Sequence, residues 1–512
     1  MMAKIKRNIL GFLSVPVLLI LVSCSSSNEL PMLSQFESTA CKHTLEANST
    51  TRCGYLIVPE DRSNPDNGRK LKLYVAIYKS LSGSSNNPPL FYLTGGPGAS
   101  TAGAYDAFES TASANYFRQN FGGERDLVVI DQRGTNNSDP ALYCSEELGP
   151  LRNQVYGISY HDAAAMRIQA FATCYSRLQA QGVNLSAYDS LENATDVRDM
   201  ALLLGFEKFN IYGASYGTRL SMMTMKHYPE RIQSVVLDSI LPPEVNPFEQ
   251  ETPGILYAFR TFFAAAKGKY PALETQFYEM MDNLETTPVD VIGHHYNSSG
   301  NPIDNIVVNV SGDKLAAYLV AKLKQTPYEK GLPKTISAMY ASGDYGLVAD
   351  AWVSNIDFFF PDGGPGSGSP SVAMYNSIFS ADDAYYTSPQ KIEQVISQNV
   401  SNASIASYLR VNFIDMEPGV LGLWPVEPLP FRESDPVISD IPTLMLVGTL
   451  DTATPEIFSR PSAAFLSRSF YFPILSGHAT AYLECVDQMI NAFVKDPRVS
   501  PANACAAVYQ WD

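Results

Sequence analysis

The feature that most constrains the fold is a short apolar run, residues 209–212, that leads into Gly213-Ala214-Ser215-Tyr216-Gly217 and then a helix-like stretch, 217–227. A strand that turns sharply into a helix crowds the backbone, so a Cβ at either glycine would collide with its neighbours. The turn holds the Ser215 hydroxyl at the helix amino terminus, where the dipole and free N–H groups favour a developing anion. We therefore predict that Ser215 is a nucleophile. The alternative is a serine that a glycine-rich turn places there for packing.

A serine hydroxyl reacts only when a base takes its proton and an acid orients the base. His478 is the candidate base, because it lies in a loop directly after the apolar run 471–474. Asp451 is the candidate acid, because it follows the apolar run 444–447. The order Ser, Asp, His, with each residue at a strand end, predicts a catalytic triad. Asp451 alone could instead cap the helix that follows it. The remaining histidines lie in polar, helical or near-terminal contexts: His43, His161, His227, His294 and His295.

An oxyanion needs N–H donors, one from the residue after the nucleophile and one from the loop after an early strand. Tyr216 follows Ser215, and Gly95-Gly96-Pro97-Gly98 follows the apolar run 90–93. We predict that the amides of Gly96 and Tyr216 form the oxyanion hole. A second run, Gly363-Gly364-Pro365-Gly366, lies among serines and glycines and is predicted to have no catalytic role.

Short apolar runs alternate with helix-like stretches, which is typical of an α/β fold with a mostly parallel sheet. The predicted strands are 71–78, 90–93, 127–130, 209–212, 235–237, 444–447 and 471–474. From about residue 242 to 430 the sequence becomes helix-rich, for example at 314–324. An insertion there would cover the crevice in which open α/β sheets bind ligands. We predict a core from 46–241 and 431–512, and a mostly helical cap from 242–430.

The amino terminus has the pattern of a targeting segment: Lys4, Lys6 and Arg7, then an apolar run, 9–22, that is too short to span a bilayer. The run ends at Cys24 in a sequence that resembles a bacterial lipobox. We expect a lipoprotein signal peptide over 1–23, a lipid anchor on Cys24 and a tether over 24–45, which together place the chain in a bacterial cell envelope. The alternative is an ordinary secretory signal with a chance cysteine.

The chain has 7 cysteines, so an even set remains when Cys24 carries lipid. Exported chains use such sets for disulfides. The simplest pairing joins sequence neighbours: Cys41 with Cys53, Cys144 with Cys174, and Cys485 with Cys505. Other connectivities, and reduced buried thiols, remain open.

The net charge of the chain argues against nucleic-acid binding. Lys and Arg number 36 against 52 Asp and Glu, a net charge of −16 that repels nucleic-acid phosphates. Cysteine and histidine show no zinc-type spacing. We expect no nucleic-acid partner, no metal and no organic cofactor; the sequence does not indicate an oligomeric state.

Further motifs accompany the triad: Cys53-Gly54, Val58-Pro59, the 95–98 loop, Asp131-Gln132-Arg133-Gly134-Thr135, Thr454-Pro455 and Gly477-His478. With them the chain, from about Cys53 onward, resembles the prolyl aminopeptidase and tripeptidyl aminopeptidase branch of the α/β-hydrolase serine peptidases. The resemblance implies an α/β-hydrolase fold with a helical cap. It also implies a serine exopeptidase that acts near free peptide amino termini through an acyl-enzyme. Thr94 and Asn136 depart from the pattern of that branch, and Asn136 fits only if its φ is positive.

The same resemblance implies that cap acids hold the substrate's α-ammonium. Asp382 and Asp383 are its first candidates, and Glu249 and Glu251 compete with them; each could instead be a solvated surface carboxylate. Two other functions stay open. One is a carboxylesterase or other acyl hydrolase with the same triad, and the other is a non-catalytic surface lipoprotein.

Overall fold

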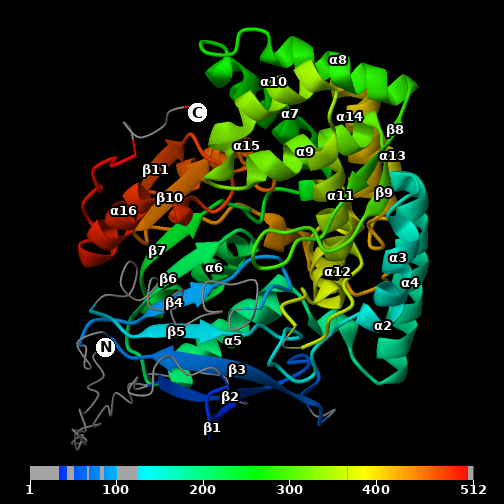
Figure 1. The fold of residues 1–512 in the computed structure, drawn as a ribbon. Coiled ribbons are helices and arrows are strands. Elements are labelled where there is room, and N and C mark those ends of the chain that lie inside the picture. Colours follow the sequence, from blue (N-terminus) through cyan, green and yellow to red (C-terminus); the bar gives the residue numbers. More distant parts are fainter. Residues whose placement is uncertain are drawn as a thin grey trace, which may run out of the picture. The chain divides into compact units, whose positions relative to one another are not determined.

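A mixed sheet of nine strands organises the computed structural model, which describes residues 34–42, 51–65, 68–80, 86–100, 124–365, 367–505 and 511 (Figure 1). The spatial order is β1-β2-β3-β5-β4-β6-β7-β10-β11. The strands are β1 (Gln35–Thr39), β2 (Thr51–Pro59), β3 (Lys70–Tyr78), β4 (Leu90–Leu93), β5 (Leu127–Ile130), β6 (Phe209–Ala214), β7 (Ile232–Asp238), β10 (Thr443–Gly448) and β11 (Ser469–Ile474). Every apolar run predicted as a strand lies in one of them, and the α/β class is confirmed.

The strands from β5 to β11 in this order run parallel to one another. The pairs β1–β2, β2–β3 and β3–β5 are antiparallel. Residues 35–39, which the sequence assigned to a tether, instead form the edge strand β1 on β2. Four of the five β1 residues are exposed, so this strand lacks the buried apolar run that identifies the others. β2 was also missed.

Side chains of the central strands alternate between two apolar layers. Ile211 and Val235 face the layer that includes α5 (Ser190–Leu203) and α6 (Tyr216–His227). Tyr212 and Val236 face the layer that includes α16 (Glu484–Lys495). Burial on both faces explains why these strands are nearly continuous apolar runs in the sequence.

The chain between β7 and β10 is mainly helical. We call residues 242–430 the cap; Figure 1 shows its helices, green to yellow, gathered beside the sheet. They are α7 (Pro247–Ala266), α8 (Leu273–Thr286), α9 (Gly312–Lys324), α10 (Leu332–Ser342), α11 (Gly346–Phe359), α12 (Val372–Asp382), α13 (Pro389–Asn399) and α14 (Ala403–Arg410). A hairpin of β8 (Val289–Gly293) and β9 (Ile306–Val310) interrupts them.

Outside the cap, four more helices accompany α5, α6 and α16. They are α2 (Ser145–Leu148), α3 (Arg152–Val155), α4 (Tyr160–Ala180) and α15 (Glu456–Ser462). In α4, Arg167 donates to the carbonyls of Phe359 and Met416, so this helix is hydrogen-bonded to the cap. None of the helices in the described ranges combines the length and apolar character that crossing a bilayer requires.

Three disulfides join Cys41 to Cys53, Cys144 to Cys174, and Cys485 to Cys505. These are the predicted pairs of sequence neighbours. The second bond ties the start of α2 to α4, and the third anchors the segment after α16.

Candidate active site

Ser215 lies at the junction of β6 and α6, with φ 57° and ψ −126°. A non-glycine residue with positive φ is strained and persists only where its surroundings enforce it. The two glycines provide the room: a Cβ at Gly213 would collide with the Gly217 carbonyl, and one at Gly217 with the Leu93 carbonyl. This is the strand–turn–helix geometry that the sequence predicted around Ser215.

The predicted acid and base meet in the structure. His478 Nδ1 lies 2.7 Å from Asp451 Oδ2, and Asp451 is fully buried. Asp451 also accepts from the amides of Ala453 at 2.7 Å and Thr454 at 3.1 Å. Burial alone would raise the pKa of Asp451, but His478 and these hydrogen bonds outweigh it and hold the pKa at about 2. The carboxylate is therefore ionised beside the imidazole.

Thr454 is an additional contact at this pair. Its hydroxyl donates to Asp451 Oδ2 at 2.8 Å and lies 3.3 Å from His478 Nδ1. The sequence singled out Thr454 only as part of a motif, without a role. Its hydroxyl fixes the carboxylate oxygen that the imidazole contacts.

Asp238, at the end of β7, holds the loop after His478. Its carboxylate accepts from the hydroxyl and amide of Thr480 at 2.8 and 2.9 Å, and from the Ala481 amide at 3.0 Å. The next residue, Ser239, accepts from the Ala479 amide at 2.8 Å. Sequence reasoning missed this anchor, because Asp238 looks like an ordinary residue at a strand end.

The loop predicted to supply an oxyanion donor lies against the nucleophile. A Cβ at Gly95 would stand 2.6 Å from Ser215 Cβ and 3.1 Å from its Oγ. Gln132 Nε2 donates to the Thr94 carbonyl at 3.0 Å and so fixes the start of the loop. Gly96, with φ 105°, takes a backbone conformation that favours glycine. The loop is thus positioned beside Ser215, and Tyr216 begins the helix on the other side.

The second glycine-proline run lies elsewhere. Its neighbour Asp362 would contact a Cβ at Gly149 and pairs with Arg152. Asn136 has φ 34°, as its place in the motif requires.

Asp382 and Asp383 are buried and already have partners. Asp383 forms an ion pair with Arg219 of α6, and the Ser190 hydroxyl donates to Asp382. Burial raises the pKa of both carboxyls, and Arg219 opposes the rise. Ser190 Oγ also lies 2.9 Å from the Tyr216 hydroxyl. These carboxyls join the end of α12 to the core behind the nucleophile helix.

Glu251 on α7 differs from them. Its side chain is buried, and its Oε2 has no hydrogen-bond partner among the described residues. Burial, followed by the charge of Asp451, raises the pKa of Glu251 well above its usual range, while Lys324 opposes the rise. One turn further along α7, a Cβ at Gly254 would stand 2.8 Å from Pro455 Cβ, so α7 packs on the Asp451 loop. Glu249 is half-buried and faces Lys391 at 3.5 Å.

Three of the other described histidines contact carboxylates, and the His294 ring contacts the Asp304 carbonyl at 2.6 Å. His161 contacts Asp415, and His227 contacts Glu433. His295 bridges Asp304 and Asp357. His43 and Cys24 lie outside the described residues. The described residues contain one cluster with metal-like spacing, Cys144, Glu147 and Cys174, and its two sulfurs are joined in a disulfide.

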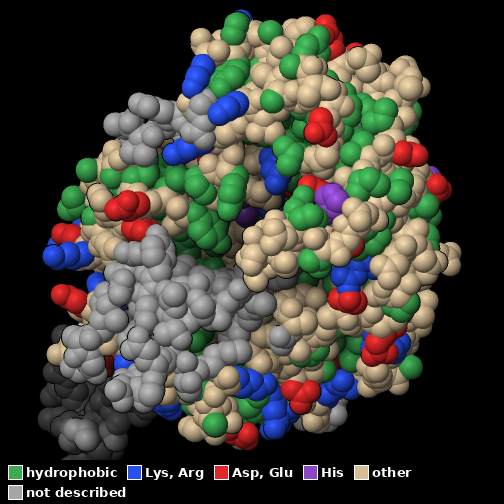
Figure 2. Space-filling model, viewed as in Figure 1, with side chains coloured by type: hydrophobic (Ala, Val, Ile, Leu, Met, Phe, Trp, Pro, Cys, Tyr) green, Lys and Arg blue, Asp and Glu red, His purple; other side chains and the backbone are tan. Residues whose placement is uncertain are grey.

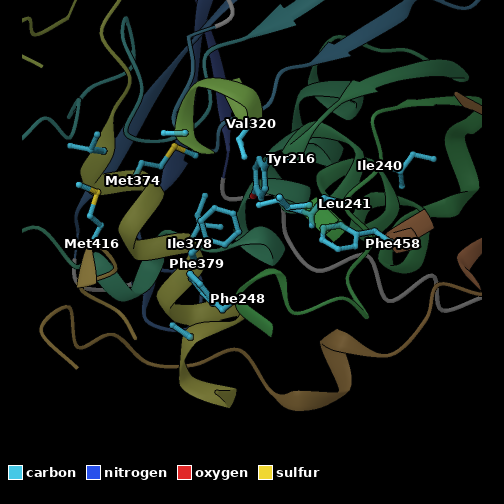
Figure 3. Packing of buried hydrophobic residues seen from close by; sticks show 14 of the residues in the cluster. Tyr216, Ile240, Leu241, Phe248, Val320, Met374, Ile378, Phe379, Met416 and Phe458 are labelled. Atoms are coloured by element: carbon cyan, nitrogen blue, oxygen red, sulfur yellow. The ribbon is translucent and has the colours of Figure 1, made fainter. Parts of the chain in front are cut away.

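Cap and core share apolar packing around this site. Figure 3 shows Tyr216 and Leu241 of the core in one cluster with Phe248 and Phe379 of the cap. The Phe248 and Phe379 rings meet edge to face, 5.9 Å apart. On the face shown in Figure 2, acidic and basic side chains are interspersed over the described surface.

The chain is similar in sequence to several bacterial peptidases. Serine protease Hip1 from Mycobacterium tuberculosis is 24% identical over 484 residues, 88% of this chain and 86% of the relative. A tripeptidyl aminopeptidase from Streptomyces coelicolor is 29% identical over 197 residues, 38% of this chain and 35% of the relative. A proline iminopeptidase from Neisseria gonorrhoeae is 26% identical over 164 residues, 32% of this chain and 36% of the relative. The model of the alpha/beta hydrolase fold matches residues 88–484, and the chain therefore belongs to the alpha/beta hydrolase fold family.

Proposed function

We propose that the chain is a serine peptidase in which Ser215, His478 and Asp451 form the catalytic triad. The observation that carries the proposal is the buried Asp451–His478 hydrogen bond in a chain whose Ser215 occupies a strained strand–helix turn. The similarity to Hip1 along most of both chains supports a peptide substrate over other acyl compounds.

In this mechanism Ser215 Oγ attacks the scissile carbonyl while His478 Nε2 takes its proton. Asp451 keeps Nδ1 protonated and stabilises the imidazolium. The amides of Gly96 and Tyr216 donate to the tetrahedral oxyanion. Collapse expels the amine, which receives the proton from His478, and leaves an acyl-enzyme. Water, deprotonated by His478, then releases the acid and restores Ser215.

We propose further that the enzyme is an aminopeptidase and that Glu251 receives the substrate's α-ammonium. A buried carboxyl without a hydrogen-bond partner is costly unless another group satisfies it. An ammonium would do so, and the position of Glu251 near Asp451 places such a substrate next to the chemistry. Asp382 and Asp383, expected first from the resemblance, have less support because Arg219 and Ser190 already engage them.

The test is a fluorogenic panel on purified protein, with Ser215→Ala as the control. The panel holds prolyl, alanyl and tripeptidyl amides, the N-acetylated form of each, and short-chain esters. We expect cleavage of the free-amine amides that Ser215→Ala abolishes. Turnover of esters alone would make the chain a carboxylesterase with the same triad. No turnover, together with no labelling of Ser215 by a fluorophosphonate, would leave a non-catalytic lipoprotein.

We also propose that Cys24 carries a lipid anchor in a bacterial cell envelope, after removal of residues 1–23. The sequence around Cys24 supports this, and the three disulfides suit an oxidising compartment. Labelling of cells with a radioactive fatty acid should mark the protein, and Cys24→Ala should abolish the label. Equal labelling of the variant would refute the anchor.

A further inference from the structure

The last turn of cap helix α9 contacts both loops that carry the proposed acid and base. Thr452, directly after Asp451, donates its hydroxyl to the Val320 carbonyl at 2.8 Å. The amide of His478 donates to the Lys324 carbonyl at 2.9 Å. Val320 and Lys324 are one helical turn apart. One turn of one helix therefore accepts a hydrogen bond from each loop.

The end of α9 explains why the bond from His478 forms. The final carbonyls of an α-helix have no partner within the helix and need donors from elsewhere. Lys324 is the last residue of α9, and the His478 amide satisfies its carbonyl. The approach is so close that a Cβ at Gly477 would stand 2.8 Å from the Lys324 oxygen. Thr452 is buried, so water does not compete for its hydroxyl.

The core holds the same histidine loop from the other side. Ser239 accepts from the Ala479 amide, and Asp238 accepts from Thr480. The cap thus holds the backbone amide of His478, and the core holds the two residues that follow it. Neither side alone determines where the ring lies.

We propose that the last turn of α9 holds both catalytic loops in place. Thr452 is then a positioning residue that fixes the Asp451 loop to this turn. The proposal rests on the triad proposed above. It makes the cap part of the catalytic machinery: lifting α9 from the core breaks both hydrogen bonds and releases His478 from its place. Substrate entry therefore uses movement in another part of the cap, while α9 stays hydrogen-bonded to the Asp451 and His478 loops.

Thr452→Val tests the proposal, because valine keeps the shape and removes the hydroxyl. Thr452→Ser keeps the donor. Thr449→Val is a matched control in the same loop, since the Thr449 hydroxyl makes no hydrogen bond with the residues that the structure describes. The readouts are kcat, KM, the rate at which a fluorophosphonate labels Ser215, and the acid limb of the kcat/KM profile, each per folded molecule by near-ultraviolet circular dichroism.

Thr452→Val should lower kcat and the labelling rate about tenfold, the effect of losing one buried hydrogen bond, with KM within about twofold of wild type. The acid limb should shift, because it reports protonation of the base that Asp451 orients. Thr452→Ser and Thr449→Val should stay within about twofold. A Gly477→Ala variant, which pushes the histidine loop off the Leu323 and Lys324 carbonyls, should repeat the Thr452→Val pattern and serves as the test if Thr452→Val folds poorly.

Wild-type labelling and turnover in both Thr452→Val and Gly477→Ala would overturn the proposal. So would an equal loss in Thr452→Ser, because the hydroxyl would then not be the cause. A wild-type protein that the fluorophosphonate does not label would instead refute the proposed function, so the two failures are distinguishable.

Discussion

Replacing Glu251 with Gln removes one potential negative charge from the cap while keeping the shape of the side chain. Burial and Asp451 raise the pKa of Glu251 well above its usual range, so the free enzyme favours the neutral carboxyl over a wider pH range than an exposed glutamate does. Glutamine resembles that neutral form. We therefore expect Glu251→Gln to fold, with a free energy of unfolding within about 1 kcal/mol of wild type.

Glu251→Gln should lower kcat/KM strongly for free-amine peptides and hardly at all for N-acetylated ones. A hydrogen bond between a carboxylate and an ammonium contributes about 1.5 to 3 kcal/mol. At about 1.4 kcal/mol per factor of ten, kcat/KM for free-amine peptides should fall about 10- to 150-fold. N-acetylated peptides lack the ammonium, so any residual activity on them should change less than about twofold.

The pH dependence follows from the same geometry. An ammonium favours the ionised form of Glu251, so binding of a free-amine peptide expels the carboxyl proton. Affinity for such peptides should rise as pH rises through the pKa of Glu251, until the substrate's own amine loses its proton at about pH 8. In Glu251→Gln the rise that Glu251 causes should vanish.

The assay compares kcat/KM for a free-amine peptide and its N-acetylated form across pH in wild type, Glu251→Gln and Glu249→Gln. Glu249 lies on the same helix but already faces Lys391, so its substitution should leave the ratio unchanged. Wild-type preference for free amines in Glu251→Gln would refute the assignment, as would the same loss in Glu249→Gln.

Three further changes have defined outcomes. Thr454→Val removes one hydrogen bond to Asp451 and should lower kcat about tenfold, measured by steady-state kinetics, with Thr454→Ser retaining activity. His295 is held between Asp304 and Asp357, which outweigh its burial and raise its pKa; its stabilising effect is therefore complete below about pH 6.5 and lost as pH rises through that raised pKa. The Tm difference between wild type and His295→Gln should accordingly be larger at pH 5.5 than at pH 9, and a pH-independent difference would contradict the charge argument. Removing the Cys144–Cys174 bond with two serines should cost about 3 to 4 kcal/mol in unfolding free energy by denaturant titration, because it frees a loop of about 30 residues.

The sequence predicted the parts of the fold that depend on residues close together along the chain. Strands such as β6 and β10 are buried on both faces, so their residues must be apolar along the whole run. Ser215 is recognisable because its turn permits no Cβ at Gly213 or Gly217. Each of these signals lies within a few residues of the feature that it predicts.

Missed features depend on partners far along the chain. Asp238 anchors Thr480, 242 residues away, and Thr452 reaches Val320, 132 residues away. The strands β8 and β9 are half-exposed and lie within a helix-rich interval, so no continuous apolar run marks them. Composition and periodicity contain no information about which distant segment will supply a partner. For the same reason they could not rank the acids of the cap, and the first place given to Asp382 and Asp383 came from the resemblance alone.

The Asp383–Arg219 pair tests whether Glu251, and not Asp383, receives the substrate ammonium. Arg219 is buried and donates to Asp383 and to the Val245 carbonyl, so Asp383→Asn leaves a buried guanidinium without its main counter-charge. Breaking a buried ion pair from one side costs about 3 to 5 kcal/mol, whereas apolar replacement of both partners is often close to neutral. We therefore expect Asp383→Asn to lower the unfolding free energy by about 3 kcal/mol in urea titration, and Asp383→Leu combined with Arg219→Met to recover most of it. The preference for free-amine over N-acetylated peptides should survive in the double variant. If Asp383 instead bound the substrate ammonium, that preference would disappear from both variants while the stability changed little, and the role given to Glu251 would pass to Asp383.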